Sequence, residues 1–153
     1  MFQIACFAGI FFLLDRFSKI IALDILPNAG EIPVIKNIFT LCLVKNRGIA
    51  FGMLNSIPPQ FLTGLILVAV LLFTIWTIST RKDSLLFMLS ISLIIGGSLG
   101  NLLDRLVYSH IIDFIQILNF PVFNIADMCI TSGFVLLLVC FFLNNKKYVS
   151  NIN

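Results

Sequence analysis

Four long apolar stretches dominate this sequence and constrain its fold more than any other feature. They span residues 2–23, 60–78, 85–103 and 126–143, and only the first carries charged side chains in its interior. A helix needs about 20 apolar residues to cross the hydrocarbon core of a bilayer. With 59% hydrophobic and 11% charged residues, a soluble domain of this length would leave much apolar surface in water. We therefore expect one integral membrane domain, residues 1–153, of the all-α class with four transmembrane helices.

Several other classes of protein are disfavoured by the composition. The net charge is only +3, and no basic stretch is interleaved with aromatic residues, so we expect no nucleic-acid partner. The four cysteines form no C-x-x-C pair, and the single histidine, His110, has no neighbouring ligand set. We therefore expect no metal and no cofactor.

The short basic connections predict the orientation in the membrane. Basic residues follow the second and fourth apolar stretches: Arg81, Lys82, Lys146 and Lys147. Because cytoplasmic loops carry the excess of Lys and Arg, these ends and both chain termini are expected in the cytoplasm. The bias is modest, since Lys36, Lys45, Arg47 and Arg105 then lie on the outer side. The two longer connections, residues 24–57 and 104–125, also face outward.

Both outer connections contain short runs typical of β-strands. Ile38–Val44 is rich in β-formers, follows a turn signal at Pro27–Gly30, and is broken by Asn46-Arg47-Gly48. Ile111–Leu118 is a second run of this kind. We expect a small extracytoplasmic β-platform near the membrane surface, with its main part in residues 31–55.

The polar residues of the chain gather at the outer ends of the predicted helices. The four segments with unusual polar content are Asp15–Lys19, Asn46–Gly52, Asn101–Arg105 and Asn124–Asp127. Each falls at the outer end of an apolar stretch or in an outer connection. This segregation predicts one polar site at the outer face.

Asp104 and Asp127 are the candidate catalytic residues of that site. One follows the third apolar stretch and the other begins the fourth, at a depth where an ionisable group is costly unless it is paired or used. Two close carboxylates in a low-dielectric site share a proton and supply a base and an acid together. A structural interpretation stays open, in which Asp104 pairs with Arg105 and Asp127 caps the fourth helix.

The other charged residues of the outer segments favour structural roles. Asp15 and Lys19 are four residues apart, so an ion pair that lets the first helix cross the bilayer is expected. Asp113 lies inside the second strand-like run, and we expect it to be a structural partner, for example of Arg105.

Three asparagines, Asn46, Asn101 and Asn124, leave two interpretations open. Their amides offer donors and an acceptor to an extended peptide backbone. Alternatively, they satisfy backbone groups at helix ends. The spacing alone does not separate these roles.

Residues 96–100 match the G-x-S-x-G pattern of serine hydrolases. That chemistry needs a strand, a sharp turn and a histidine in reach, whereas Ser98 lies inside an apolar helix and His110 lies in an outer connection. Gly96 and Gly100 instead fit the small-xxx-small pattern of close helix packing.

The four polar segments together resemble the lipoprotein signal peptidases (signal peptidase II). DRFSK at 15–19 resembles the family's D-x-x-[ST]-K segment, and NRGIAFG at 46–52 resembles its N-x-G-x-A-F block. GSLGNLLDRL at 97–106 resembles G-N-x-x-D-R, and VFNIADMCI at 122–130 resembles F-N-x-A-D. All four occur in order across most of the chain.

The resemblance implies a membrane aspartyl endopeptidase of the bacterial cytoplasmic (inner) membrane, with its active site at the outer face. It would remove the signal peptide of diacylglyceryl-modified prolipoproteins, cutting before the lipidated cysteine. By resemblance, Asp104 and Asp127 would be catalytic. The implied substrate-binding residues are Asn46, Gly48, Asn101, Arg105 and Asn124. The expected partners are the lipid-modified signal peptides and membrane lipid, and the enzyme is expected to be a monomer.

The alternative from another class is a proton-coupled membrane carrier or channel subunit that uses the buried aspartates. It predicts charge that moves through to the cytoplasmic side. Residues 60–78 and 85–103 contain no ionisable side chain to relay it. A flux assay in proteoliposomes separates the two functions.

Overall fold

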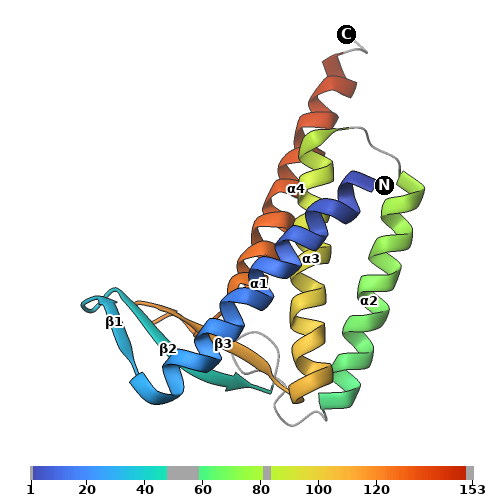
Figure 1. Cartoon of the computed structure of the whole chain (residues 1–153). Helices are drawn as coiled ribbons and strands as arrows, with labels where there is room; N and C mark the ends of the chain where they lie inside the picture. Colours follow the sequence, from blue (N-terminus) through green and yellow to red (C-terminus); the bar gives the residue numbers. More distant parts are fainter. Residues whose placement is uncertain (1, 48–58, 81–83, 151–153) are drawn as a thin grey trace.

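The computed structural model describes residues 2–47, 59–80 and 84–150. Its helices are α1 (Phe2–Ala29), α2 (Pro59–Thr80), α3 (Leu85–Tyr108) and α4 (Ile125–Ser150). Its strands are β1 (Ile32–Ile35), β2 (Phe39–Asn46) and β3 (Ile111–Ile117). In Figure 1 α3 lies between α2 and the pair formed by α1 and α4, and the sheet projects sideways at the end of the bundle opposite to both termini.

Two of the helices are long and apolar enough to cross a membrane over their described residues. These are α3, with a mean hydropathy of 1.9, and residues Ile125–Leu143 of α4, with a mean hydropathy of 2.2. In α2 the described apolar segment is the shorter Leu67–Trp76. The expected membrane-helix class is thus supported for α3 and α4, and four crossing helices remain a proposal.

At the sheet-bearing end of the bundle, α1 and α3 extend beyond the ends predicted from hydropathy. α1 includes Pro27 and ends at Ala29. The next residue, Gly30, has a φ of +70°, a left-handed conformation that glycine adopts without steric cost. α3 continues past 103 to Tyr108 and is closed by the Ser109 N–H, which donates to the Arg105 carbonyl at 3.0 Å. Asp104 and Arg105 interrupt the apolar run but not the helix, so the hydropathy pattern ended too early.

The three strands form an antiparallel sheet in the order β1-β2-β3. Leu41 of β2 lies opposite Ile32 of β1 and Ile115 of β3, so the middle strand fixes the register on both sides. Ala22 and Leu26 of α1 form a buried core with Phe114 and Ile115 of β3. Packing on α1 therefore holds the sheet beside the end of the bundle opposite to both termini, and the expected small β-sheet is present.

Glycines on α3 let the helices approach closely enough to build a site between them. A side chain at Gly97 would place its Cβ 2.5 Å from the Ala126 carbonyl oxygen of α4, and one at Gly96 would lie 2.6 Å from the Ala8 oxygen of α1. At Gly100 the Cβ would meet the carboxylate of Asp15. The missing side chains at these glycines let α1 and α4 pack closely against α3, as the small-residue spacing predicted.

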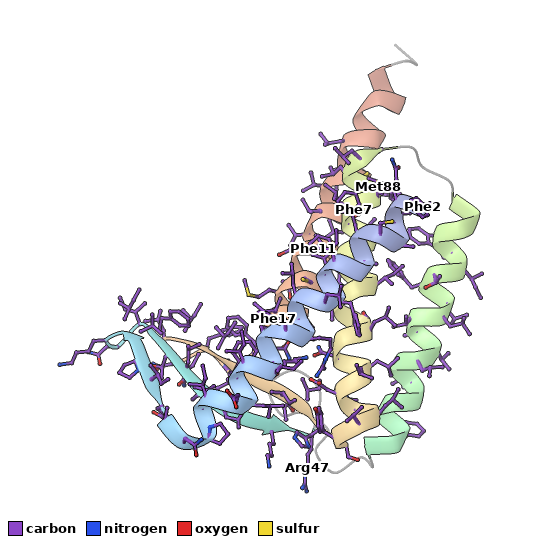
Figure 2. All side chains as sticks on the ribbon, in the orientation of Figure 1. Phe2, Phe7, Phe11, Phe17, Arg47 and Met88 are labelled. Carbon is purple, nitrogen blue, oxygen red and sulfur yellow. The ribbon has the colours of Figure 1, made fainter. Side chains whose placement is uncertain are left out.

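The side chains at the two ends of the bundle differ in kind. Figure 2 shows Arg47 at the end that carries the sheet, whereas Phe2 and Met88 lie at the opposite end. Between them, Phe7, Phe11 and Phe17 are spaced along α1 (Figure 2). The charged and amide side chains of the candidate site come from the sheet-bearing end.

Candidate active site

Four charged side chains form a buried group, which we call the ion cluster: Asp15, Arg16, Lys19 and Asp104. Lys19 Nζ lies 3.0 Å from Asp15 Oδ2 and 2.7 Å from Asp104 Oδ2, and Arg16 Nη1 pairs with Asp104 Oδ1. The side chains of Asp15, Lys19 and Asp104 have 0% exposure. Two acids thus neutralise two bases, which makes their burial among apolar helices tolerable.

The carboxylates of the ion cluster also accept hydrogen bonds from backbone N–H groups of β3 and α4. Asp104 Oδ2 accepts a hydrogen bond from the Ile112 N–H of β3 at 3.2 Å. Asp15 Oδ1 accepts one from the Ala126 N–H in the first turn of α4 at 2.9 Å, where no intrahelical acceptor is available. The cluster therefore ties α1, α3, β3 and α4 together.

Asn124 and Asp127 form a reciprocal cap at the start of α4. Asn124 Oδ1 accepts from the Asp127 N–H at 2.9 Å, and Asp127 Oδ2 accepts from the Asn124 N–H at 3.3 Å. The capping residue is thus Asn124, with Asp127 three positions further on, as in a capping box. The second oxygen of Asp127, Oδ1, accepts from Asn101 Nδ2 at 2.8 Å.

Asp113 of β3 is joined to Asp127 through the same asparagine. Its Oδ1 accepts from Asn124 Nδ2 at 2.7 Å, and its Oδ2 accepts from Asn46 Nδ2 at 2.9 Å. The pKa of the Asp113 carboxyl is raised from 3.8 to about 6: burial is the largest cause, the Asn46 hydrogen bond opposes it, and the charge of Asp127 adds to the rise. The charge of Asp127 thus affects the protonation of Asp113.

Asn101 connects the ion cluster to this pair. Its Oδ1 accepts from Lys19 Nζ at 3.0 Å and from Asn124 Nδ2 at 3.1 Å, while its Nδ2 donates to Asp127. The asparagine amides at positions 101 and 124 are thus used to orient carboxylates.

A cavity of about 620 Å³ opens at the aspartate pair. Its polar end is lined by Asn46, Asn101, Arg105, Asp113 and Asp127. The remaining wall is largely apolar and comes from α2, α3, α4 and the segment Phe120–Phe123. Arg105 is 7% exposed and interacts electrostatically with Asp127, Asp113 and Asp104. The polar end thus carries two acids and one fixed cation beside an apolar chamber.

Asp104, the expected partner of Asp127, does not line this cavity. Asn101 and Arg105, one helical turn apart, share the face of α3 toward the cavity, whereas Asp104 is turned toward the cations of α1. The structure brings Asp113 to that place instead. A signal for Asp113 was present in the sequence, since it is one charged residue inside the otherwise apolar run IIDFI at 111–115.

The other sequence-based candidates lie as follows. Ser98 lines the cavity, but His110 does not, and its ring contacts Tyr108 with centroids 6.0 Å apart. Gly48 lies outside the described residues. Within the described ranges, no three His, Cys, Asp or Glu side chains are grouped to hold a metal ion.

Two carboxylates, the buried Asp113 and the partly buried Asp127, face one cavity at the end of an apolar helix bundle. This is the arrangement expected of a membrane aspartic peptidase. Comparison with known proteins identifies the family. Residues 7–143 match the family described as Signal peptidase (SPase) II, and the chain belongs to it.

Individual relatives agree with this family over nearly the whole chain. A lipoprotein signal peptidase of Clostridium acetobutylicum is 38% identical over 142 residues, covering 88% of this chain and 90% of the relative. One of Chlorobaculum parvum is 39% identical over 165 residues, covering 97% of this chain and 98% of the relative.

Two solved bacterial membrane enzymes have a similar fold. One, determined by the in meso method at 1.9 Å, has a TM-score of 0.82 and 26% identity, covering 92% of this chain and 93% of the other. The second, at 2.3 Å, has a TM-score of 0.84 and 23% identity, covering 96% and 92%. The helix bundle with its side sheet is therefore the fold of a bacterial membrane enzyme.

Proposed function

We propose that this chain removes the signal peptide from diacylglyceryl-modified prolipoproteins, cutting before the lipidated cysteine, and that Asp113 and Asp127 carry out the cleavage. The observation that carries the proposal is the link from Asp113 through Asn124 to Asp127 at the polar end of the cavity. Membership of the signal peptidase II family supplies the substrate class.

The chemistry requires one proton on the pair. The ionised carboxylate takes a proton from water while the water oxygen attacks the scissile carbonyl carbon, and the protonated carboxyl donates to the carbonyl oxygen. In the second step the carbon–nitrogen bond breaks as the carboxyl that took the water proton gives it to the departing amine. The other carboxylate takes a hydroxyl proton back from the intermediate as its carbonyl re-forms, which restores the starting pair. The pKa of about 6 at Asp113 supports such sharing, because a carboxyl with this pKa still holds a proton in part of the molecules near neutral pH.

The remaining polar residues serve this pair in different ways. Asn101 and Asn124 orient the two carboxylates, so we assign them to positioning rather than to direct substrate binding. Arg105 lines the cavity beside both acids and is suited to hold a carbonyl oxygen of the peptide. Asn46 reaches the cavity as well, and Gly48, two residues further on, keeps its proposed place in substrate binding.

We assign Asp104 to the structure of the site. Its oxygens are engaged by Arg16, Lys19 and the Ile112 N–H, so no oxygen faces the cavity to meet a water molecule. Asp15 and Lys19 share this role. Because the ion cluster neutralises the charges of Asp15, Arg16 and Lys19, α1 can cross the bilayer.

We further infer the arrangement in the bacterial inner membrane. All four helices cross it, both termini lie in the cytoplasm, and the site and sheet lie at the outer face. The basic residues at 81–82 and 146–147 support this orientation. The apolar wall of the cavity, which includes Val70, Phe73 and Phe134, suits an apolar signal peptide that enters from the bilayer. One chain supplies every group of the site, which is consistent with a monomer.

The proposal is tested with purified protein and a prolipoprotein in two forms. The first form carries the diacylglyceryl group on its cysteine, and the second has serine at that position and cannot be modified. Cleavage of the first form alone, lost in Asp127→Asn, is the expected result.

Two results would contradict the proposal. One is equal cleavage of both forms, and the other is cleavage by Asp127→Asn at the wild-type rate. A proton flux in proteoliposomes that needs Asp127 in the absence of any cleavage would favour a carrier instead.

A further inference from the structure

The end of the sheet farthest from the helix bundle carries a group of exposed apolar side chains, which we call the sheet-tip patch: Ile35, Ile38, Ile117 and Leu118. Each is between 43% and 61% exposed. They come from the turn between β1 and β2 and from the turn after β3. No other described part of the sheet combines so many large apolar side chains without cover.

Backbone hydrogen bonds bring these two turns together. The Leu118 N–H donates to the Ile38 carbonyl at 2.7 Å, and the Ile38 N–H donates to the Ile35 carbonyl at 3.0 Å. Leu118 has a φ of +51°, a left-handed conformation that a leucine adopts only at a steric cost. The fold therefore bears strain to hold an apolar side chain outward, which is unfavourable if that side chain meets water.

The patch lies on the sheet that packs against α1, and the membrane arrangement proposed above turns the exposed side of α1 toward lipid. The outward side of α1 carries Leu14 and Phe17, which are 54% and 67% exposed. In Figure 1 the turn between β1 and β2 lies beside the bundle, at about the height where α4 begins rather than beyond the end of α3. The patch thus points back toward the level of the bilayer.

The charge beside the patch matches a lipid surface. Lys36 is exposed between Ile35 and Asn37 at the turn. A lysine there can keep its apolar stem at the acyl chains and its ammonium group among anionic headgroups. Apolar side chains flanked by a cation are typical of segments that lie in the membrane interface.

We propose that the sheet-tip patch inserts into the headgroup–acyl boundary of the outer leaflet and anchors the sheet there, with anionic phospholipid as its partner. The anchor fixes the tilt of the sheet, and hence β3, relative to the membrane. This inference rests on the membrane setting of the chain and not on the identity of its substrate.

The test places a fluorescent indole at the patch. The natural Trp76 is replaced in Trp76→Phe, and Ile38→Trp or Ile35→Trp is added to that background. Glu31→Trp is the matched control, because Glu31 is exposed at the opposite end of β1. Each protein is reconstituted in phosphatidylcholine–phosphatidylglycerol vesicles whose acyl chains are brominated near the headgroup, and its fold is checked by thermal unfolding.

We expect lipid brominated near the headgroup to quench most of the emission of the indoles at 38 and 35. Lipid brominated deep in the acyl chains should quench it less. The indole at 31 should keep its emission and be quenched by aqueous iodide. Equal quenching at 38, 35 and 31 would overturn the proposal. Blue-shifted emission at 38 that neither bromine nor iodide quenches would also overturn it, since protein, such as a second copy of this chain, would then cover the patch.

Discussion

Replacing Asp104 by asparagine removes the carboxylate that three donors share. Arg16 Nη1, Lys19 Nζ at 2.7 Å and the Ile112 N–H at 3.2 Å all point at its two oxygens. Asparagine offers one acceptor oxygen and no charge, and its NH₂ group faces a cation. The variant therefore leaves buried positive charge with too little compensation.

The expected loss of stability depends on the partners that Lys19 and Arg16 keep in the variant. Removing one partner of a buried ion pair costs about 3–5 kcal/mol. Lys19 keeps Asp15 and Asn101, each at 3.0 Å, and the 12% exposed Arg16 can turn toward water. These contacts reduce the cost to the lower end, about 3 kcal/mol of unfolding free energy.

Unfolding of the purified proteins in detergent, followed by circular dichroism, measures this loss. Asp24→Asn is the matched control, because Asp24 is an exposed carboxylate of α1, and it should stay within about 0.5 kcal/mol of the wild type. Equal stability of Asp104→Asn and Asp24→Asn would refute the reasoning, since Asp104 would then carry no part of the ion cluster.

Three further predictions concern the site and the helix packing. The raised pKa of about 6 at Asp113 means that wild-type stability falls as pH rises from 3.8 to 6. Asp113→Asn does not ionise at this position. Its unfolding free energy, measured relative to that of the wild type in paired unfolding curves, should therefore rise by up to about 3 kcal/mol as pH goes from about 4 to about 7.5. Asn101→Leu removes the 2.8 Å hydrogen bond to Asp127, and kcat/KM should fall about 10–100-fold while the protein stays folded. Gly97→Ala, with its Cβ 2.5 Å from the Ala126 oxygen, should lose about 2 kcal/mol. Gly64→Ala, with nothing within 4 Å, should lose none in the same unfolding assay.

The helices could be predicted from the sequence because long apolar segments leave a strong hydropathy signal. Their ends beside the sheet could not, since hydropathy falls at the first charged residue while the helix continues. Arg105 is inside α3, and Pro27 is inside α1. Both ends continue because tertiary contacts, such as Leu26 against Phe114, hold them.

The location of the site followed from the segregation of polar residues, but the pairing of its carboxylates did not. Asp104 and Asp127 look equivalent in sequence, each at the outer end of an apolar stretch. Whether Asp104 faces the cavity depends on the rotation of α3 about its axis. In the structure this residue faces α1, where it pairs with Arg16 and Lys19. Asp113 could be placed only once β3 was known to pass beside Asn124.

The central claim is that Asp113 and Asp127, and not Asp104, share the reaction. The most direct measurement is single-turnover cleavage of a lipidated prolipoprotein, expressed per folded molecule, for Asp113→Asn, Asp127→Asn and Asp104→Asn. The account predicts no cleavage by the first two and measurable cleavage by the folded fraction of the third. Wild-type cleavage by Asp113→Asn, together with a folded but inactive Asp104→Asn, would contradict it.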